Sequence, residues 1–300
     1  MLKSGSREQQ TGNPAGREGE RRPDRTVKGM FTGPIPGVLL RLALPVFGGM
    51  LFQLLYGIVD TIWISRIDLS DPSYVGGVGL ILPLLFLAVA LSSGMLIGVG
   101  SLVARSIGER NHRLLARIPE SGMVVAGGIS LVLVAAGYLF DADLVRLLGA
   151  EGAYFVHALD YLRFILPAGG LMVVGNVFLG LLHGEGLMGK LMKTMIITTA
   201  ANVVLDPVFI FLLGLGVRGA GIATVISQVI TGFYLVGVFL SRKTSVRIQW
   251  RLRNVDVRVM GQIAAVGFPQ AAGLITMSVS FLFFNRMVVS IDRLALTAFA

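Results

Sequence analysis

The sequence predicts an all-α membrane protein, and two observations support this fold class. Hydrophobic residues make up 54% of the 300 residues and charged residues only 14%, against roughly 25% charged in a soluble domain. Apolar runs of about 18 residues or more recur along the chain, each long enough to cross a hydrocarbon core of about 30 Å. Cysteine is absent, which excludes disulfides, thiol catalysis and Cys-ligated zinc.

Seven membrane spans are predicted, and each has the length that a membrane helix needs. They lie at roughly 38–66, 75–100, 119–140, 157–182, 191–214, 219–241 and 263–290. The polar segment 1–36 contains too few apolar residues to form a core, so it is predicted to be a disordered, basic cytoplasmic tail. It lacks the apolar centre of a cleavable signal peptide.

The distribution of positive charge predicts the orientation of these spans. Most of the 26 Lys and Arg residues lie in the tail through Arg41 and in the connections 101–118, 183–193 and 242–258. Such residues accumulate on the cytoplasmic side. We therefore expect a multi-pass protein of the plasma (inner) membrane with a cytoplasmic N-terminus. The net charge of +9 does not indicate nucleic-acid binding, because the positive charges lie between apolar segments.

A weak internal repeat predicts two lobes. The segment "LALPVFGGMLFQLLYGIVDTIWIS" in the first span resembles "AAVGFPQAAGLITMSVSFLFFNRMVVS" in the seventh, and each has a proline near its cytoplasmic end, Pro45 and Pro269. Repeats that run in the same direction occur in several transporter folds. The predicted organisation is a six-helix amino-terminal lobe at 37–241, a cytoplasmic inter-lobe connection at 242–262, and the first helix of a truncated second lobe at 263–300.

Two acids, Asp60 and Asp206, lie well inside predicted spans. Ionisable residues at such positions are costly to insert and are functional candidates by default. For Asp60 the alternative is a helix-end residue that reaches the outer interface. Glu185 and Asp160 lie near span ends, where a position at the level of the lipid headgroups explains them.

Counting residues places four polar side chains at one depth. At about 1.5 Å per residue, Asp60 lies roughly 9 Å below the outer end of the first span, and Asp206 roughly 12 Å below the outer end of the fifth. Thr224 on the sixth span lies roughly 9 Å from the same side, and Tyr161 on the fourth is at a similar depth. Spans of one lobe could therefore bring these groups together.

The helical spacing adds two further residues to this level. Asn202 precedes Asp206 by four positions and Tyr56 precedes Asp60 by four, so each pair shares one helix face. Two carboxylates, an amide oxygen and a hydroxyl form the all-oxygen set that hard cations such as Na⁺ require. Alternatively, two neighbouring acids in a low dielectric resist double ionisation, and one holds a proton.

At this point the sequence resembles a known family. The strings "LPVFGGMLFQLLYGIVDTIWIS", "LLHGEGLMGKLMKTMIITTAANVVLDPVFIF" and "GVRGAGIATVISQ" look like the multidrug and toxic compound extrusion (MATE) transporters, in particular the DNA-damage-inducible branch, over about residues 34–300. The resemblance implies two six-helix lobes around a central cleft. It also implies export of cationic, amphipathic xenobiotics in exchange for H⁺ or Na⁺, with no cofactor and no enzymatic activity.

The resemblance also implies roles for individual residues. It assigns Asp60, Asn202, Asp206 and Thr224 to a cation site, Tyr56 and Tyr161 to its hydrogen-bond network, Gln53 to the substrate cavity, and Pro45 to a hinge in the first helix. Asn176 and Met195 are further candidates for the cavity, with helix packing as the alternative for both. Apart from a possible Na⁺ at the cation site, no metal is expected.

The sequence therefore predicts a cation-coupled antiporter for organic cations, working by alternating access in contact with membrane lipids. A lipid-linked oligosaccharide flippase of the same superfamily is one alternative, but several Arg or Lys residues would then be expected in the cavity. A non-transporting remnant is another, because the chain stops at "RLALTAFA", where an eighth span would begin. A longer chain or a partner would supply the second lobe. A membrane-embedded enzyme is not supported by any nucleophile–base or metal constellation.

Overall fold

The computed structural model describes residues 35–68, 70–241, 244–249 and 252–291, and its regular structure is entirely helical over these residues. The chain divides into two units, Met1–Leu39 and Leu40–Ala300. Of the first unit only residues 35–39 are described, so the predicted tail falls almost wholly outside the described residues. The packing and the sites reported below belong to the second unit.

Seven membrane-length helices are present in the described chain, which confirms the predicted number of spans. They are α2 (Ile35–Ser65), α3 (Ser73–Gly108), α5 (Ile118–Leu139), α7 (Gly152–Gly184), α8 (Met188–Pro207), α9 (Val217–Leu240) and α10 (Val257–Ile291). The short helices α4 (His112–Leu115) and α6 (Asp141–Leu147) lie in two of the connections. α10 begins ahead of the predicted residue 263, because part of the basic connection is already helical.

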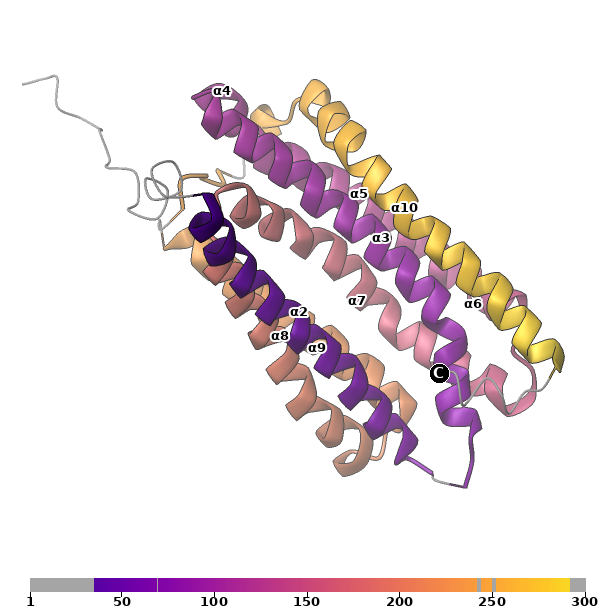
Figure 1. Ribbon diagram of the computed structural model, residues 1–300. Coiled ribbons are helices and arrows are strands. Elements are labelled where there is room, and N and C mark those ends of the chain that lie inside the picture. Colours follow the sequence, from indigo (N-terminus) through magenta and orange to yellow (C-terminus); the bar gives the residue numbers. More distant parts are fainter. Residues whose placement is uncertain (1–34, 69, 242–243, 250–251, 292–300) are drawn as a thin grey trace, which may run out of the picture. The chain divides into compact units, whose positions relative to one another are not determined.

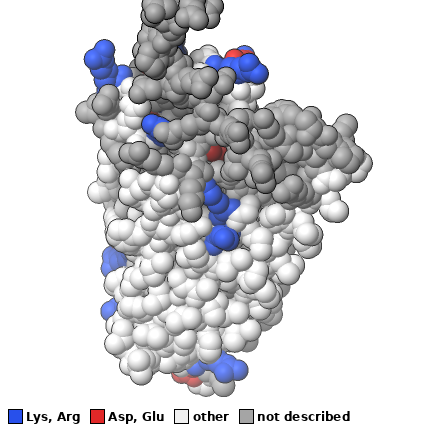
Figure 2. Space-filling model, turned by 90° about the vertical axis from the view of Figure 1, so that its left-hand side faces the viewer, with Lys and Arg blue, Asp and Glu red and all other residues white. Residues whose placement is uncertain are grey.

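The long helices α3, α5, α7, α8 and α9 run alternately up and down within the second unit (Figure 1). We call one end of this unit the Asp141 end, where α5 ends, α6 lies, and α7 and α9 begin. The other is the Glu185 end, where α7 and α9 end and α10 begins. Uncharged residues cover most of the described part of the face in Figure 2, as expected for a surface in contact with lipid.

Glycines let α3 and α7 approach closely, and α7 is the central helix against which α3, α5 and α9 pack. A Cβ added at Gly180 would lie 2.8 Å from the Leu96 carbonyl oxygen, and one at Gly184 would lie 2.6 Å from Cβ of Val103. Both distances are shorter than any van der Waals contact. Small residues at such crossings are the usual means of packing helices in membranes.

The same device joins α10 to α3 (Figure 1). A Cβ at Gly94 would lie 2.8 Å from the carbonyl oxygen of Gly267, so these two backbones meet with no side chain between them. Further along, the ring centroids of Phe86 and Phe281 stand 5.1 Å apart. The helix predicted to open a second lobe therefore packs directly on α3 of the first.

The helix α2 is the least buried of the seven spans. Near its start, Leu44 and Phe47 are 65% and 64% exposed, whereas Ile64 in its last turn is 2% exposed and joins the core with Leu80 and Leu162. α2 is thus anchored at the Asp141 end and loosely packed elsewhere in its described part.

The connection between α9 and α10 is fastened across the Glu185 end by backbone hydrogen bonds. The backbone N–H groups of Ser245 and Val246 donate to Oε2 and Oε1 of Glu185, both at 2.8 Å, and the Gln249 N–H donates to Oε1 of Glu120 at 2.8 Å. Both glutamates are only 6% exposed. Burial raises the pKa of Glu185, while the two amide hydrogen bonds act in the opposite direction.

A position at headgroup level is therefore not a sufficient explanation of Glu185, which also has a structural role. Its carboxylate is buried because the connection folds back over it, and Val246 beside it is 1% exposed. We call the described residues 244–249 the strap. Its role could not be read from span boundaries, since it depends on the path of a loop.

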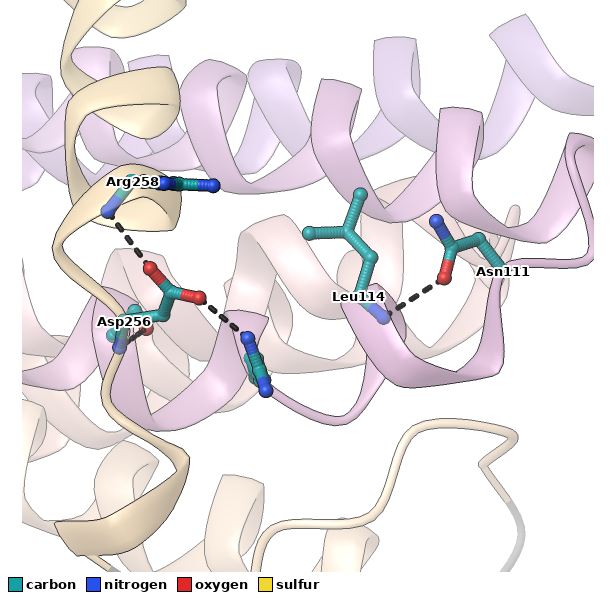
Figure 3. A network of polar contacts seen from close by, with 6 residues as sticks. Asn111, Leu114, Asp256 and Arg258 are labelled. Carbon is teal, nitrogen blue, oxygen red and sulfur yellow. Dashed lines mark hydrogen bonds and ion pairs between the residues drawn. The ribbon is translucent and has the colours of Figure 1, made fainter.

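A second set of contacts fixes the start of α10. Asp256 accepts a hydrogen bond from the Arg258 N–H at 2.9 Å and pairs with Arg117 at 2.5 Å. Figure 3 shows the carboxylate of Asp256 directed at Arg258, and, in the neighbouring turn, the Asn111 side chain accepting a bond from the Leu114 N–H. The pair of Arg117 with Asp256 joins the start of α5 to the start of α10 at the Glu185 end.

Candidate cation site and central cavity

A cavity of about 640 Å³ opens among α2, α3, α7, α8 and α9. Its lining is mostly apolar, with residues such as Met50, Leu82, Ile165 and Met172. Asp60 is the one charged residue in that lining among the residues described. A largely apolar cavity with a few polar groups is typical of a small-molecule site.

Three residues predicted to share one depth do line this cavity together: Asp60, Tyr161 and Thr224. Tyr161 is 2% exposed and Thr224 is 8% exposed. The Thr224 hydroxyl donates to the Ala220 carbonyl at 3.0 Å and accepts a hydrogen bond from the Asn202 amide at 3.2 Å. Three of the four residues that counting places at one depth therefore line one cavity.

Asn202 and Asp206 lie behind this part of the wall and are completely buried. Neither carboxylate oxygen of Asp206 has a hydrogen-bond partner in the described chain, and the same holds for Oδ1 of Asn202 and Oδ1 of Asp60. The carboxylates of Asp60 and Asp206 are close enough to interact electrostatically. Acceptor oxygens thus gather here without matching donors.

Such an arrangement is costly without a ligand. A buried polar atom that lacks a partner costs about 1–3 kcal/mol, and more when it is charged. A bound cation, either Na⁺ or a proton on one carboxylate, would satisfy the acceptors and offset the repulsion between the acids. No group of three or more His, Cys, Asp or Glu residues suited to a divalent metal occurs within the described ranges.

Local structure helps to fix Asp206. Pro207 ends α8 directly after it, and a single π-helical turn, Val208–Leu212, follows. Proline has no N–H to continue the helical ladder, and π turns occur frequently at functional sites. The string "DPVFIF" therefore encodes both the acid and the change in helix type beside it.

The predicted substrate-cavity residues Gln53, Asn176 and Met195 all line the same cavity. Asn176 donates to the Met172 carbonyl of its own helix at 2.8 Å, so helix packing and cavity lining are both parts of its role. Met195 lies against Gly49 of α2, where an added Cβ would collide with its sulfur.

Two predicted residues gain no support. The Tyr56 side chain lies outside the described residues, so its place in a hydrogen-bond network stays a prediction. Pro45 lies inside α2, which continues without a break on both sides of it, so its role as a hinge also stays a prediction.

Sequence reasoning missed a row of hydroxyls on α8 and α9. Thr198 and Thr231 bond to each other across these helices at 2.7 Å, and both line the cavity with Thr194 and Ser227. Spacing was the available signal, since 194 and 198, like 227 and 231, stand four residues apart on one helix face.

The geometry defines a class: a multi-pass helical membrane protein with a central cavity beside intramembrane acids, which is the arrangement of a membrane transporter. Comparison with known proteins specifies the family. The model of the MatE family matches residues 45–208, more than half of the chain, so the chain belongs to the MatE family.

Individual relatives agree. Multidrug export protein MepA of Staphylococcus aureus is 22% identical over 268 residues, which cover 89% of this chain and 58% of MepA. MepA of Staphylococcus saprophyticus is 23% identical over 262 residues, covering 87% and 57%. The chain thus spans somewhat more than half the length of the curated relatives that it matches.

Solved structures give the same result for the fold. A MOP superfamily transporter from Pyrococcus furiosus matches with a TM-score of 0.80 and 30% identity, over 90% of this chain and 59% of that one. A multidrug resistance MATE family transporter matches in its outward-facing conformation (TM-score 0.81, 29% identity, 93% and 61% covered) and in its inward-facing conformation (0.77, 28%, 86% and 59%).

Proposed function

We propose that this chain forms the ion-binding lobe of a cation-coupled antiporter that exports amphipathic organic cations. The observation that carries the proposal is the cluster of buried acceptor oxygens on Asp60, Asn202 and Asp206 that lack partners within the described chain. A purely structural polar cluster would be internally satisfied. Family membership and the names of the relatives support export of small molecules.

The coupling ion is H⁺ or Na⁺. One proton shared by two acids would leave one negative charge, and Na⁺ would balance one of two charges while it accepts lone pairs from the amide and hydroxyl oxygens. Both ions suit an oxygen-only site. Thr224 takes part in either case, because its hydroxyl bonds to Asn202.

Asp60 links the ion to the cavity, since it belongs to the acceptor cluster and also lines the cavity. A cationic substrate would add positive charge beside a site that also attracts the coupling ion. The two ligands therefore weaken each other's binding, and this reciprocal coupling is what exchange requires. The apolar lining would hold the body of an amphipathic substrate.

Alternating access would involve a movement of α2. Its anchored end carries Asp60 and Ile64, whereas Leu44 and Phe47, on either side of Pro45, are largely exposed. Proline within a helix permits bending. A change of charge at Asp60 would thus act on α2, the span of the lobe that has the smallest share of buried residues.

The cavity lining contains no Lys or Arg among the described residues, so nothing favours the flippase alternative. The relatives are named as exporters rather than enzymes. We further propose that the Glu185 end faces the cytoplasm of a plasma (inner) membrane, because the predicted basic connections lie at that end.

The test compares Asp60→Asn with Asp143→Asn, an exposed acid at the Asp141 end. Ion binding is measured by Na⁺ titration and pH jumps, with the fluorescence of Trp63, one turn from Asp60, as the signal. Ion-driven efflux of a fluorescent organic cation is measured in proteoliposomes that contain a complete transporter, in which a second lobe is present. We expect Asp60→Asn to reduce both at least about tenfold, as for loss of a charged ligand, and Asp143→Asn to change neither. Efflux that persists in Asp60→Asn would contradict the proposal.

A further inference from the structure

A second cavity, of about 510 Å³, lies between α5, α7 and α9. On α7 it is lined by Asp160, Arg163, Phe164 and Pro167, whereas the central cavity takes Tyr161, Ile165 and Ala168 from the same helix. At about 100° per residue these two sets fall on different faces of α7. We call this second cavity the α7 groove, and the cation site does not use it.

Two ion pairs form the rim of the α7 groove: Asp160, Arg163 and Arg218 line it, and Asp141 lies next to it, bonded to Arg163. Arg163 Nε bonds to Asp141 Oδ2 at 2.6 Å, and Arg218 Nη2 bonds to Asp160 Oδ2 at 3.0 Å. The arginine side chains remain 49% and 55% exposed, and each guanidinium carries five N–H donors in all. The guanidinium of Arg163 holds the pKa of Asp141 below its ordinary value, so this part of the rim stays charged.

Below the rim the groove is apolar. Its floor is formed by Phe164 and Pro167 of α7 and by Ile222 and Val225 of α9. Arg218 stands at the beginning of the α9 span, so its pair with Asp160 lies near headgroup level. The long side chain of Arg163 extends toward the same end of the unit to reach Asp141. Val225 lies roughly 10 Å deeper than Arg218 along α9. A charged rim at the membrane surface above an apolar groove matches the charged headgroup and the apolar acyl chains of a phospholipid.

The groove is also braced. Pro167 has no N–H, so the carbonyl of Arg163, four residues earlier, loses its helical partner. The Tyr138 hydroxyl of α5 donates to this carbonyl at 2.8 Å. The break in the helical ladder thus fastens α5 to α7 beside the groove, which fixes the width of the opening before any ligand binds.

We propose that the α7 groove binds one zwitterionic phospholipid of the phosphatidylethanolamine type. The phosphate bonds to Arg163 and Arg218, the ammonium group bonds to the carboxylates of Asp160 and Asp141, and the acyl chain lies along Ile222 and Val225. Arginine matches the geometry of phosphate oxygens. Two arginines and two aspartates leave the rim without net charge, so a headgroup that carries both signs complements it better than an anionic one.

The size of the groove agrees with this ligand. A volume of about 510 Å³ is within the roughly 300–1,000 Å³ of small-molecule pockets. It is enough for the headgroup and the upper part of one chain, with the rest of the lipid in the bilayer. A free ammonium group has three N–H donors for the two carboxylates, which a quaternary choline lacks.

The experiment is native mass spectrometry of the 300-residue chain in detergent, titrated with phosphatidylethanolamine or phosphatidylglycerol. Arg218→Gln removes a phosphate contact, and Arg146→Gln is the matched control, since Arg146 forms an exposed ion pair at the same end of the unit, 3.6 Å from Asp143. We expect Arg218→Gln to weaken phosphatidylethanolamine binding about tenfold or more, and Arg146→Gln to leave it unchanged.

A second variant tests the floor without touching a charge. Val225→Trp places a large side chain where the acyl chain would lie and should also weaken phosphatidylethanolamine binding, with an unchanged thermal midpoint as evidence of folding. Equal binding by Arg218→Gln and Arg146→Gln would overturn the proposal. Phosphatidylglycerol that binds as tightly as phosphatidylethanolamine would overturn it too.

Discussion

Asp206 and Glu185 are both buried carboxylates, yet their surroundings differ in every respect that matters for a charge. Glu185 is 6% exposed, and each of its oxygens accepts a backbone N–H of the strap at 2.8 Å. Asp206 is 0% exposed, and neither of its oxygens has a hydrogen-bond partner in the described chain. One acid is satisfied by its own protein and the other is not.

The difference separates a structural acid from a binding acid. A carboxylate that holds two amide groups stabilises the fold, because those amides would otherwise be buried without partners. A carboxylate left unsatisfied in a folded protein destabilises the fold unless a ligand compensates it. Glu120 stands between the two, with Oε1 bonded to the Gln249 N–H and Oε2 without a partner in the described chain.

The largest effect is expected for Glu185→Gln. Glutamine keeps one acceptor oxygen but turns an NH₂ group toward a backbone N–H of Ser245 or Val246, so one buried amide loses its partner. The free energy of unfolding should fall by about 1–3 kcal/mol, seen as a lower thermal midpoint of the chain in detergent. Na⁺ binding should not change.

Glu120→Gln is the matched control for that prediction. Its amide oxygen can still accept the Gln249 N–H, and its NH₂ group takes the place of the oxygen that has no partner. We expect a midpoint close to that of the unchanged chain. Equal losses in both glutamate variants would mean that burial of the acid, rather than its bonds to the strap, determines stability.

Asp206→Asn should have an effect of opposite sign. Asparagine has nearly the same size and carries no charge, and its NH₂ group can donate to Oδ1 of Asn202. In Na⁺-free buffer at neutral pH the free energy of unfolding should therefore increase by about 0.5–2 kcal/mol, as is common when a strained functional site is relieved. The increase is measured as a higher thermal midpoint.

The same variant removes the response to ions. Added Na⁺ or added acid should stabilise the unchanged chain, because a ligand that binds only the folded state raises its stability, and should not stabilise Asp206→Asn. A lower midpoint for Asp206→Asn in ion-free buffer would contradict the distinction between the two acids.

The sequence was sufficient for the spans and for the level of the acids. Span length follows from the thickness of the hydrocarbon core, so the seven apolar runs translate directly into seven helices. Asp60 and Asp206 stood out because charges inside spans are rare. Counting at a fixed rise per residue put Asp60, Tyr161 and Thr224 at one depth, and these three line one cavity.

Contacts that depend on loops and helix faces could not be predicted in the same way. The burial of Glu185 was not predicted, because nothing in its neighbours indicates that residues 244–249 fold back over it. The α7 groove could not be predicted, because it depends on the relative rotation of α5, α7 and α9, which brings Arg163 and Arg218 to the same cavity. The helical periodicity of a single segment carries no information about how that helix is rotated relative to its neighbours.

The smallest effect is expected for Asp256→Asn, at the edge of the strap region. Backbone donation from Arg258, and then the guanidinium of Arg117, holds the pKa of Asp256 below its ordinary value of about 3.9. A carboxylate with a lowered pKa contributes stability above that ordinary value and loses it as the pH falls through the lowered one. Asp256→Asn should therefore reduce the thermal midpoint slightly at neutral pH, less than Glu185→Gln does, because this ion pair is solvent-accessible and screened.

The difference in thermal midpoint between Asp256→Asn and the unchanged chain should disappear as the pH is lowered below about 3.9. The control variant Asp143→Asn should show no such difference at any pH. A difference that persists in acid would assign the role of Asp256 to its shape rather than its charge, leaving Glu185 as the acid whose hydrogen bonds to the backbone hold this end of the protein.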